Sequence, residues 1–401
     1  MIKRIISIAL LFTITTVSAS AFAENEREIF ENAISWLQAE STWQIRACKR
    51  DMHNGVAAFP PQVGIGYEAF WLRDYAYMLE GAPEAFSEKE LLDAVEVFLN
   101  AQRDDGACVD CVKFDGTPIY QPGYGSMGSN PVADGSQFTV DVVYCTWRKL
   151  RDPKLLEPRV LDSLIKALDA VPRSESGLVF IDPQLDWDRC PYGFHDTIRK
   201  QGEALFCSLL YCQAAGQLSE MLREGGREID AKRFDDDKIK VANSINQTFW
   251  DEEVGLYRGA TIQCREHDVW GSAFAVYLGV APEEKTQRIA SYFKKHYSEL
   301  TQNGQIRGTI GGVYWEKGCE RDFYQNGAYW GTASGWFIYA LATIDVPLAA
   351  QATRELINDY RRNGVSEWIF GEKRNMPQYV ANAALPIAGL RKTLDLLERQ
   401  P

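Results

Sequence analysis

Residues 268–297 of the chain are DVWGSAFAVYLGVAPEEKTQRIASYFKKHY. Apolar side chains recur at helical spacing in both halves of this stretch, which predicts one helix near 268–279 and another near 282–297. Pro282 stands where the first turn of a helix tolerates proline, because the N–H that proline lacks would have no partner there. The stretch therefore predicts a hairpin of two helices joined by a short turn.

The same helical spacing recurs along the whole chain, and strand-like alternation is scarce. Ser87 precedes Glu88 and Glu90 in the order typical of a helix start, and Asp196 precedes an amphipathic run. The odd-numbered helices are expected near 25–40, 87–102, 153–171, 230–249, 282–297 and 347–362. The even-numbered helices are expected near 68–80, 137–150, 196–224, 268–279, 332–344 and 378–397.

The connections between these twelve helices alternate in length. Links from odd to even helices are mostly long and rich in Gly, Trp, Tyr and acids, whereas links from even to odd helices are mostly short. Long loops without regular structure are uncommon unless they are functional. Six helical hairpins with their long loops on one side predict an all-α (α/α)6 barrel. The competing fold is an open helical solenoid, whose repeats would be more uniform in length.

The N-terminus has the order of a secretory signal peptide. A short positive segment, Met1–Arg4, precedes the apolar run Ile5–Val17 and a cleavage site at Ala21-Phe22-Ala23. We expect residues 1–23 to be removed and residues 24–401 to form one barrel domain, because no Pro-, Gly- or Ser-rich linker divides them. No later stretch reaches the roughly 18 apolar residues of a membrane helix, so we expect a periplasmic or secreted protein.

The charge of the chain bears on its partners. Without the leader, 41 basic and 55 acidic residues leave a net charge of −14. Such a chain repels polyanions, so nucleic acid is an unfavourable partner and neutral substrates fit better. The 11 Trp, 18 Tyr and 19 Phe can stack on the apolar faces of sugar rings, although most aromatic residues in any protein fill its core.

Nine cysteines raise the question of disulfides and metals. In an oxidising compartment some should pair, and an odd number leaves at least one unpaired. Cys108 and Cys111 could form a local disulfide, stay free or be half of a zinc site, but a second CxxC is missing and only four His are present. Cys207 and Cys212 lie in an apolar helical run and are expected to be buried thiols. We expect no metal and no cofactor.

Four segments at or beside the long loops concentrate aromatic, acidic and amide side chains. The first is Phe70-Trp71-Leu72-Arg73-Asp74-Tyr75, and the second is Asp186-Trp187-Asp188-Arg189-Cys190-Pro191-Tyr192-Gly193-Phe194. The third is Phe323-Tyr324-Gln325-Asn326-Gly327-Ala328-Tyr329-Trp330. The fourth is Ser366-Glu367-Trp368-Ile369, followed by Tyr379 and the helix that begins near it.

This ordered set resembles the glucoamylase-type six-hairpin glycosidases over nearly the whole mature chain. In that family W-x-R-D binds the non-reducing sugar, W-E-E carries the general acid, Y-Y-N-G-x-P-W precedes the fifth inner helix and a late A-E-Q carries the general base. The resemblance implies an (α/α)6-barrel glycoside hydrolase acting on a carbohydrate. It implies substrate-binding roles for Trp71, Arg73, Asp74, Trp187, Tyr324, Asn326 and Trp330.

The chemistry needs two carboxyl groups. An inverting glycosidase uses one protonated acid at the leaving oxygen and one carboxylate that activates water, about 6.5–9.5 Å apart. Asp188 and Glu367 fit the acid and base by position, and the aromatic neighbours Trp187 and Tyr192 would raise the pKa of Asp188. The family has Glu where this chain has Asp188.

Each assignment has alternatives. Asp188 could be a loop acid that caps a helix, with Asp186 and Asp196 as rival acids in the same link. Glu367 could be a solvated acid in the first turn of a helix, with Glu316 and Glu320 as rival bases.

The binding residues have alternatives of their own. Arg73 and Asp74 could be a buried structural ion pair rather than a sugar-binding pair. Trp71, Tyr324 and Trp330 could be core residues rather than stacking platforms. His195 could be an acid–base group, although a His at a helix start is often only a polar loop residue.

The sequence thus predicts an exported glycoside hydrolase, inverting and exo-acting on α-linked glucosides or oligosaccharides. Two alternatives remain open. One is another carbohydrate enzyme on the same toroid, namely an unsaturated uronyl hydrolase, an epimerase or a lyase. Epimerases of this shape use paired His, and uronate enzymes need cationic groups that this acidic chain disfavours. The other is a non-catalytic sugar-binding protein.

Overall fold

The computed structural model of the chain describes residues 26–64, 66–120, 132–184 and 195–399. These ranges are mostly helical, as predicted. The expected signal peptide, residues 1–23, lies outside them, as does the second motif segment, residues 186–194. In the described part of the chain, no helix is both long and apolar enough to cross a bilayer.

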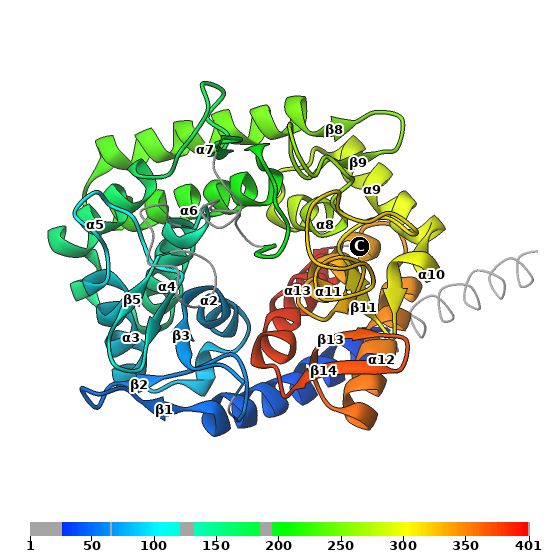
Figure 1. Cartoon of the computed structure of the whole chain (residues 1–401), viewed down its shortest axis with the longest axis horizontal. Helices are drawn as coiled ribbons and strands as arrows, with labels where there is room; N and C mark the ends of the chain where they lie inside the picture. The colour runs from blue at the N-terminus through cyan, green and yellow to red at the C-terminus, as the bar shows by residue number, and fades with distance from the viewer. Residues whose placement is uncertain (1–25, 65, 121–131, 185–194, 400–401) are drawn as a thin grey trace, which may run out of the picture.

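Six helices form a closed ring around the centre of the molecule (Figure 1). Each contacts the next in chain order, and α13 contacts α2, so the first and last members also meet. An open solenoid would keep its ends apart, and this contact therefore contradicts that alternative. The six are α2 (Leu72–Gly81), α4 (Gly135–Leu150), α6 (Leu205–Glu224), α8 (Val269–Leu278), α11 (Ser334–Ala342) and α13 (Val380–Arg399).

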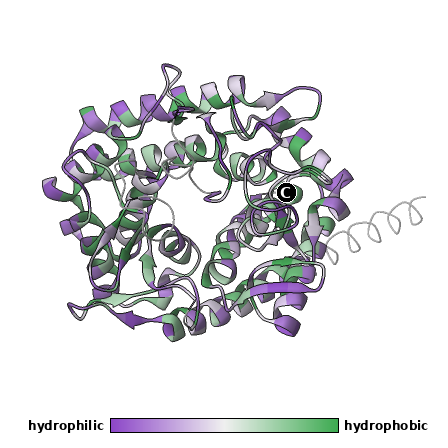
Figure 2. Ribbon diagram, in the orientation of Figure 1, coloured by the Kyte–Doolittle hydropathy of each residue, from purple (hydrophilic) through white to green (hydrophobic). Residues whose placement is uncertain are grey.

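The remaining long helices lie outside this ring and alternate with it along the chain (Figure 1). Their patterning is amphipathic: α5 buries Val160, Leu161, Leu164 and Leu168 on one side. Figure 2 shows hydrophobic colour along the inner helices and more hydrophilic colour on the outer ones. The outer helices are residues 26–48, α3 (Glu88–Asn100), α5 (Pro158–Asp169), α7 (Glu228–Thr248), α9 (Glu283–Lys295) and α12 (Val346–Asn363), with the short α10 (Tyr297–Leu300) after α9.

Glycines allow inner helices to pack with their backbones in close contact. A side chain at Gly389 of α13 would lie 2.3 Å from the backbone of Gly335 in α11. A real Cβ atom does not approach that closely, so both positions require glycine. This packing fixes α13 beside α11, and the N-terminal ends of both helices border the candidate site described below.

The described chain is mostly helical, as the all-α prediction implies, and its long links also contain short antiparallel strands that the prediction did not include. The largest sheet has five strands in the order β10-β11-β12-β13-β14. Strands of two to five residues are too short to show a clear period of two, so the sequence pattern did not reveal them. The five are β10 (Thr301–Gln302), β11 (Gln305–Arg307), β12 (Tyr329–Trp330), β13 (Ser366–Phe370) and β14 (Lys373–Pro377).

The other strands form smaller sheets within the links. A three-stranded sheet has the order β3-β4-β5, and three further sheets have two strands each. Their strands are β1 (Arg50–Asp51), β2 (Ala57–Ala58), β3 (Ala69–Trp71), β4 (Cys111–Lys113), β5 (Pro118–Ile119), β6 (Phe180–Ile181), β7 (Gly202–Glu203), β8 (Trp250–Asp251) and β9 (Leu256–Tyr257). Two 3-10 helices, η1 (Pro83–Ala85) and η2 (Pro153–Leu156), complete the elements.

The start of α6 also differs from the prediction. Asp196 does not begin this helix, which starts nine residues later at Leu205. Long-range contacts hold the intervening residues instead: the backbone N–H of Thr197 donates to Gln325, and Lys200 pairs with Asp268. Tertiary interactions thus override the local helix-start signal.

Seven cysteines in the described ranges are free thiols: Cys48, Cys108, Cys111, Cys145, Cys212, Cys264 and Cys319. Cys108 and Cys111 are both buried and free, so the local disulfide is not formed and the expectation that some cysteines pair is not met among these seven. Cys207 and Cys212 are both buried, as predicted. Cys190 lies outside the described residues.

Candidate active site

A small cavity of about 60 Å³ lies where α2, α11 and α13 begin. It is much smaller than the several hundred Å³ of a typical small-molecule site, so the described side chains enclose at most one end of a substrate. Five residues predicted from the sequence line it: Trp71, Arg73, Asp74, Tyr324 and Trp330. The others are Tyr67, Tyr77, Asp196, Gln325, Thr332 and Tyr379.

Three of the four motif segments therefore meet at one place. The first supplies residues from β3 and α2, the third supplies residues from the link before α11, and Tyr379 of the fourth lies just before α13. The second segment, with Asp186, Trp187 and Asp188, lies outside the described residues, and its predicted roles stay predictions.

Glu367 is a buried acid, the second residue of β13, and not an acid in the first turn of a helix. Its exposed fraction is 1 %. The hydroxyl of Tyr67 donates a hydrogen bond to its carboxyl group. Burial raises the pKa of Glu367 to about 8, while the hydrogen bond from Tyr67 acts in the opposite direction and the charges of Asp74 and Asp196 raise it further.

The backbone around Glu367 is fixed from α13. The side-chain amide of Asn382 donates to the carbonyl oxygens of Ser366 and Glu367, each at 2.8 Å. Its own carbonyl accepts from Thr332, at 2.6 Å, in the link before α11. Because Asn382 is fully buried, this bridge holds the strand carrying Glu367 against the ends of two inner helices.

The two rival bases lie elsewhere. Glu316 and Glu320 are both exposed, whereas Glu367 is buried. An exposed carboxylate has no enclosed space in which to hold a water molecule. Of the three acids considered as a base, Glu367 alone has the surroundings of a catalytic group.

Asp196 is the one rival for the general acid that the structure describes. Its carboxyl group borders the cavity, and burial raises its pKa, against the lowering effects of the Arg73 charge and a hydrogen bond with Gln325. Gln325 in turn accepts from both the backbone N–H and the hydroxyl of Thr197, each at 3.0 Å. The loop carrying Asp196 is thus joined to the third motif segment.

Arg73 is engaged in a buried ion pair, although Asp74 is not its partner. Its Nε and Nη2 each lie 3.1 Å from the carboxylate of Asp134, the residue preceding α4. Asp110 lies 3.6 Å from Nη2, and burial raises the pKa of Asp110 to about 8 although the Arg73 charge lowers it. A bidentate pair of this kind fixes the guanidinium, which favours the structural interpretation of Arg73.

Asp74 faces the other side of the cavity. The hydroxyl of Tyr379 donates to its Oδ1 at 2.5 Å. Burial raises the pKa of Asp74 to about 6, and the Tyr379 hydrogen bond and the Arg73 charge oppose that rise. Asp74 therefore has the polar partners and the position expected of a group that accepts hydrogen bonds from sugar hydroxyls.

Six of the residues that line the cavity are aromatic, and three of them were predicted from the sequence: Trp71, Tyr324 and Trp330. The rings of Tyr324 and Trp330 meet edge to face with centroids 5.0 Å apart, and the indole N–H of Trp330 donates to the Tyr324 carbonyl oxygen at 3.0 Å. Tyr324 has a φ of 47°, a left-handed conformation that is unfavourable for a bulky residue. Such backbone strain is concentrated at functional sites. The ring of Trp71 completes the wall from β3.

Asn326, a predicted binding residue, instead stabilises its own loop. Its carbonyl oxygen accepts from the backbone N–H of Trp315 at 2.8 Å, and its amide donates to the carbonyl oxygen of Cys319 at 2.8 Å. The side chain is buried and is not among those that line the cavity. Its hydrogen-bonding groups are used within the protein, which favours a structural role.

His195 also lies outside the cavity lining. Its Nδ1 is 2.7 Å from the ammonium group of Lys200, and its ring stacks on Trp270 with centroids 4.9 Å apart. Burial and the Lys200 charge lower its pKa well below the usual value, so the ring is neutral. An imidazole whose Nδ1 is bound to an ammonium group is a poor candidate for an acid–base catalyst.

Two tyrosines that contact the buried carboxyl groups were not predicted from the sequence. Tyr67 lies in a link rich in glycine, and nothing in its neighbourhood distinguishes it from the other tyrosines. Tyr379 belongs to the fourth segment, but the sequence assigns it no role. Their functions depend on partners about 300 residues away, Glu367 and Asp74, and long-range pairs of this kind leave no local pattern.

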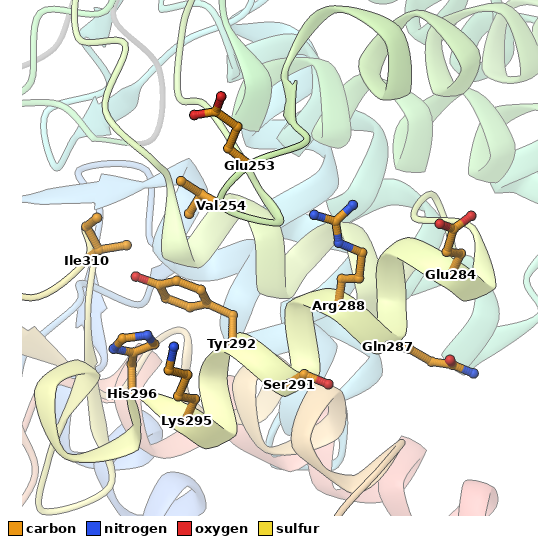
Figure 3. Close-up of a pocket in the computed structure, with 10 residues that line it drawn as sticks. All are labelled: Glu253, Val254, Glu284, Gln287, Arg288, Ser291, Tyr292, Lys295, His296 and Ile310. Carbon is orange, nitrogen blue, oxygen red and sulfur yellow. The ribbon is translucent and has the colours of Figure 1, made fainter.

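A larger cavity lies elsewhere in the described part of the chain, a groove of about 690 Å³ along α9 (Figure 3). Its lining includes Glu253, Glu284, Arg288, Tyr292 and His296, from α9 and the turn between β8 and β9. Glu253 and Glu284 are exposed, and none of the four motif segments contributes to it. It lacks the facing buried carboxyl groups that hydrolysis requires, so size does not make it the active site.

The described ranges contain no group of three or more His, Cys, Asp or Glu arranged to hold a metal ion. The charged groups around the small cavity are mainly carboxyls: Asp74, Asp196 and Glu367 influence one another, and the nearby Arg73 is paired with Asp134.

Comparison with known proteins shows likeness in structure but not in sequence. Neither the protein-family models nor the curated proteins include a match to the sequence. The structure is similar to the GH63 mannosylglycerate hydrolase of Thermus thermophilus in complex with glucose, with a TM-score of 0.65 and 14 % identity over 88 % of this chain and 99 % of that one. The chain shares its fold.

Two rhamnosidases are also similar. The enzyme from Klebsiella oxytoca with rhamnose bound has a TM-score of 0.62 and 14 % identity, over 90 % of this chain and 64 % of that one. The GH78 family rhamnosidase of Bacillus sp. GL1 has a TM-score of 0.58 and 15 % identity, over 90 % of this chain and 34 % of that one. These neighbours are (α/α)6-barrel enzymes of the six-hairpin glycosidase type, the group that the motif order resembled.

Proposed function

We propose that the chain is an exported glycoside hydrolase whose (α/α)6 barrel binds the terminal sugar of an α-linked substrate in the small cavity. The observation that carries this proposal is Glu367: it is buried, accepts a hydrogen bond from Tyr67 and interacts electrostatically with a second acid, Asp196, and both of these partners line the cavity. Glycoside hydrolysis requires two carboxyl groups. Here they come from two distant links, near the ends at which inner helices begin.

In this proposal Glu367 is the general base and Asp196 or Asp188 the general acid. Burial favours the protonated form of Asp196, as an acid at the leaving oxygen requires. Burial raises the pKa of Glu367 to about 8, so this base would be ionised mainly at alkaline pH, and the hydrogen bond from Tyr67 favours the ionised form that activation of water requires. Inversion further requires room for a water molecule between Glu367 and the anomeric carbon.

The charges at the cavity support a neutral sugar as the substrate. The cation that lines the cavity, Arg73, is already paired with Asp134, and Asp74, Asp196 and Glu367 are acids, so these groups give a uronate carboxylate no favourable charge. The glucose in the Thermus structure supports a glucoside, and the rhamnose in the Klebsiella structure makes a rhamnoside worth testing. The W-x-R-D segment from Trp71 to Asp74 supports an exo-acting enzyme, because its counterpart in the glucoamylase-type enzymes that it resembles binds the non-reducing sugar.

A screen of the purified mature chain tests the proposal. Chromogenic α-glucosides, α-mannosides and α-rhamnosides, natural oligosaccharides and unsaturated uronides would be incubated with wild type and with Glu367→Gln, and NMR would identify the anomer released first. We expect turnover of a neutral glycoside with inversion, lost in the variant. Activity on unsaturated uronides alone would favour the other toroid enzymes, and sugar binding without turnover would favour a binding protein.

A further inference from the structure

Behind the cavity lies a cluster of three buried polar side chains that the proposed reaction does not use directly. Lys200 and Asp268 form an ion pair of 3.0 Å, with 3 % and 0 % of their side chains exposed. The ammonium group of Lys200 also lies 2.7 Å from Nδ1 of His195. We name Lys200, Asp268 and His195 the buried triad.

Aromatic rings surround this triad. The Lys200 ammonium lies 4.6 Å from the centroid of the Trp315 ring, and the His195 ring lies between Trp315 and Trp270 at 5.5 and 4.9 Å. A buried ion pair in such surroundings is often no more stabilising than an apolar replacement, since both charges lose their hydration. Stability alone is therefore a weak reason for a chain to carry this triad.

The triad joins two elements that border the active-site region. Asp268 precedes α8 and accepts from the backbone N–H of Gly271 at 2.7 Å, so its carboxylate is fixed to the start of that inner helix. Lys200 and His195 lie in the loop before α6. Through Lys200, the fixed carboxylate of Asp268 determines where that loop lies.

His195 connects the buried triad to a residue that lines the cavity. The residue that follows it is Asp196, whose carboxyl group borders the cavity. The ammonium donates to Nδ1 of the neutral imidazole, so the ring proton is on Nε2 and the ring has one orientation. Because the two residues share a peptide bond, a shift of the His195 backbone would displace Asp196.

We propose that Lys200, Asp268 and His195 are positioning residues that hold the Asp196 carboxyl group in place for protonation of the leaving oxygen. This inference rests on the proposed function and on Asp196 being its general acid. None of the three triad residues is among those lining the cavity, so they act through Asp196 and not on the substrate. Substituting a triad residue should therefore lower the turnover of each substrate in proportion to how much that substrate depends on acid catalysis.

The test compares two substrates with the same terminal sugar. One is a natural oligosaccharide, whose leaving group needs protonation, and the other is an activated dinitrophenyl glycoside, whose leaving group does not. Asp196→Asn is first shown to lower kcat on the natural substrate selectively. Lys200→Met is then expected to lower kcat on the natural substrate at least about ten-fold more than on the activated one, a fraction of the 10²–10⁴-fold effect typical of acid catalysis.

Matched variants separate positioning from general damage. His195→Asn keeps an acceptor near the place of Nδ1 and should retain most of the wild-type ratio between the two substrates, whereas His195→Leu should lose it. Arg173→Met breaks the 3.0 Å pair with Asp237, and Arg173 does not line the cavity. It should lower the melting temperature without changing the ratio. Lys200→Met/Asp268→Asn, which leaves no buried charge alone, replaces the single variant if that fails to fold.

The outcomes are distinct. A wild type that hydrolyses neither substrate would overturn the proposed function itself. An active wild type in which Lys200→Met lowers both rates equally, as Arg173→Met does, would overturn the positioning role and leave the proposed function intact. An unchanged ratio in Asp196→Asn would place the acid elsewhere and also overturn the positioning role. A selective loss in Lys200→Met and His195→Leu, restored in His195→Asn, would establish it.

Discussion

The hydroxyl of Tyr67 donates a hydrogen bond to the carboxyl group of Glu367, 300 residues further along the chain. Burial raises the pKa of Glu367, and this bond partly offsets the rise by stabilising the ionised form. Tyr67 therefore controls how far the carboxyl is ionised at neutral pH. Since a general base must be ionised and a general acid protonated, the same pair can reveal which of the two roles Glu367 has.

Tyr67→Phe should move one limb of the pH–rate profile. Without the hydrogen bond the pKa of Glu367 rises, by about 1–2 units if the bond to a charged acceptor contributes about 1.5–3 kcal/mol. If Glu367 is the base, the rising limb of kcat/KM moves to higher pH. A shift of the falling limb would instead make Glu367 the acid.

Tyr314→Phe is the matched control for this experiment. Tyr314 also donates to a carboxylate, that of Asp322 at 2.6 Å, and does not line the cavity. Its removal should leave both limbs in place. If Tyr67→Phe does so as well, the bond does not influence the ionisation that limits the rate.

Glu367→Gln should make the protein more stable at alkaline pH. The folded pKa of about 8 exceeds the ordinary value of 4.5, so the folded state holds a proton that the unfolded state has lost between these limits. Wild-type stability therefore falls as pH rises through this window, by at most about 1.4 kcal/mol per pH unit for this group. Glutamine carries no such proton and avoids the loss.

Thermal melts from pH 4 to 9 measure this effect. The melting temperatures of Glu367→Gln and wild type should differ least near pH 4, and the variant should melt progressively higher than wild type up to about pH 8. Glu316→Gln, which changes an exposed acid, should follow wild type throughout. Parallel curves for wild type and Glu367→Gln would show that the Glu367 pKa is not raised by folding.

Arg73 and Asp74, neighbours in the sequence, should respond differently to substitution. Arg73→Met leaves the buried carboxylate of Asp134 without its bidentate partner and should cost about 3–5 kcal/mol of unfolding free energy. Asp74→Asn keeps the shape and an acceptor for Tyr379 and should leave the melting temperature unchanged or higher. Its KM should rise about ten-fold, as loss of a charge-assisted hydrogen bond to a sugar hydroxyl implies.

Melting curves and Michaelis–Menten kinetics on the two variants decide between these roles. An Arg73→Met protein with normal stability and a raised KM would show that Arg73 binds the sugar. An Asp74→Asn protein with an unchanged KM would show that Asp74 does not bind the sugar.

The helical ring could be predicted from the sequence, because the apolar spacing that indicates each helix is a local pattern. In α5 the apolar residues at Val160, Leu161, Leu164 and Leu168 fall on one side of a helix, and that periodicity survives without any knowledge of the partner. The alternation of long and short links then left few arrangements for six such hairpins.

The details of the site could not be predicted from the sequence, because they depend on contacts between residues that are distant along the chain. Asn326 belongs to the same motif segment as Tyr324, yet its amide is taken up by Trp315 and Cys319. Asp196 resembles a helix start locally, yet Gln325 and the buried triad hold its loop in place. In each case the side chain has two plausible uses, and only the fold selects one.

The assignment of the general acid yields the last prediction. If Asp196 is the acid, Asp196→Asn should lose turnover of a natural oligosaccharide by about 10²–10⁴-fold and retain much of it on a dinitrophenyl glycoside, while Asp188→Asn and Asp186→Asn stay close to wild type on both. If Asp188 is the acid, the selective loss moves to Asp188→Asn. Glu367→Ala should fail on both substrates, because no leaving group compensates for the missing activation of water. Azide or formate in the vacated space should restore part of its rate on the activated substrate and yield a product of inverted configuration. Recovery of a retained product would instead indicate a retaining mechanism through a covalent intermediate. No recovery in Glu367→Ala, together with recovery of Asp196→Asn by azide, would exchange the roles of acid and base.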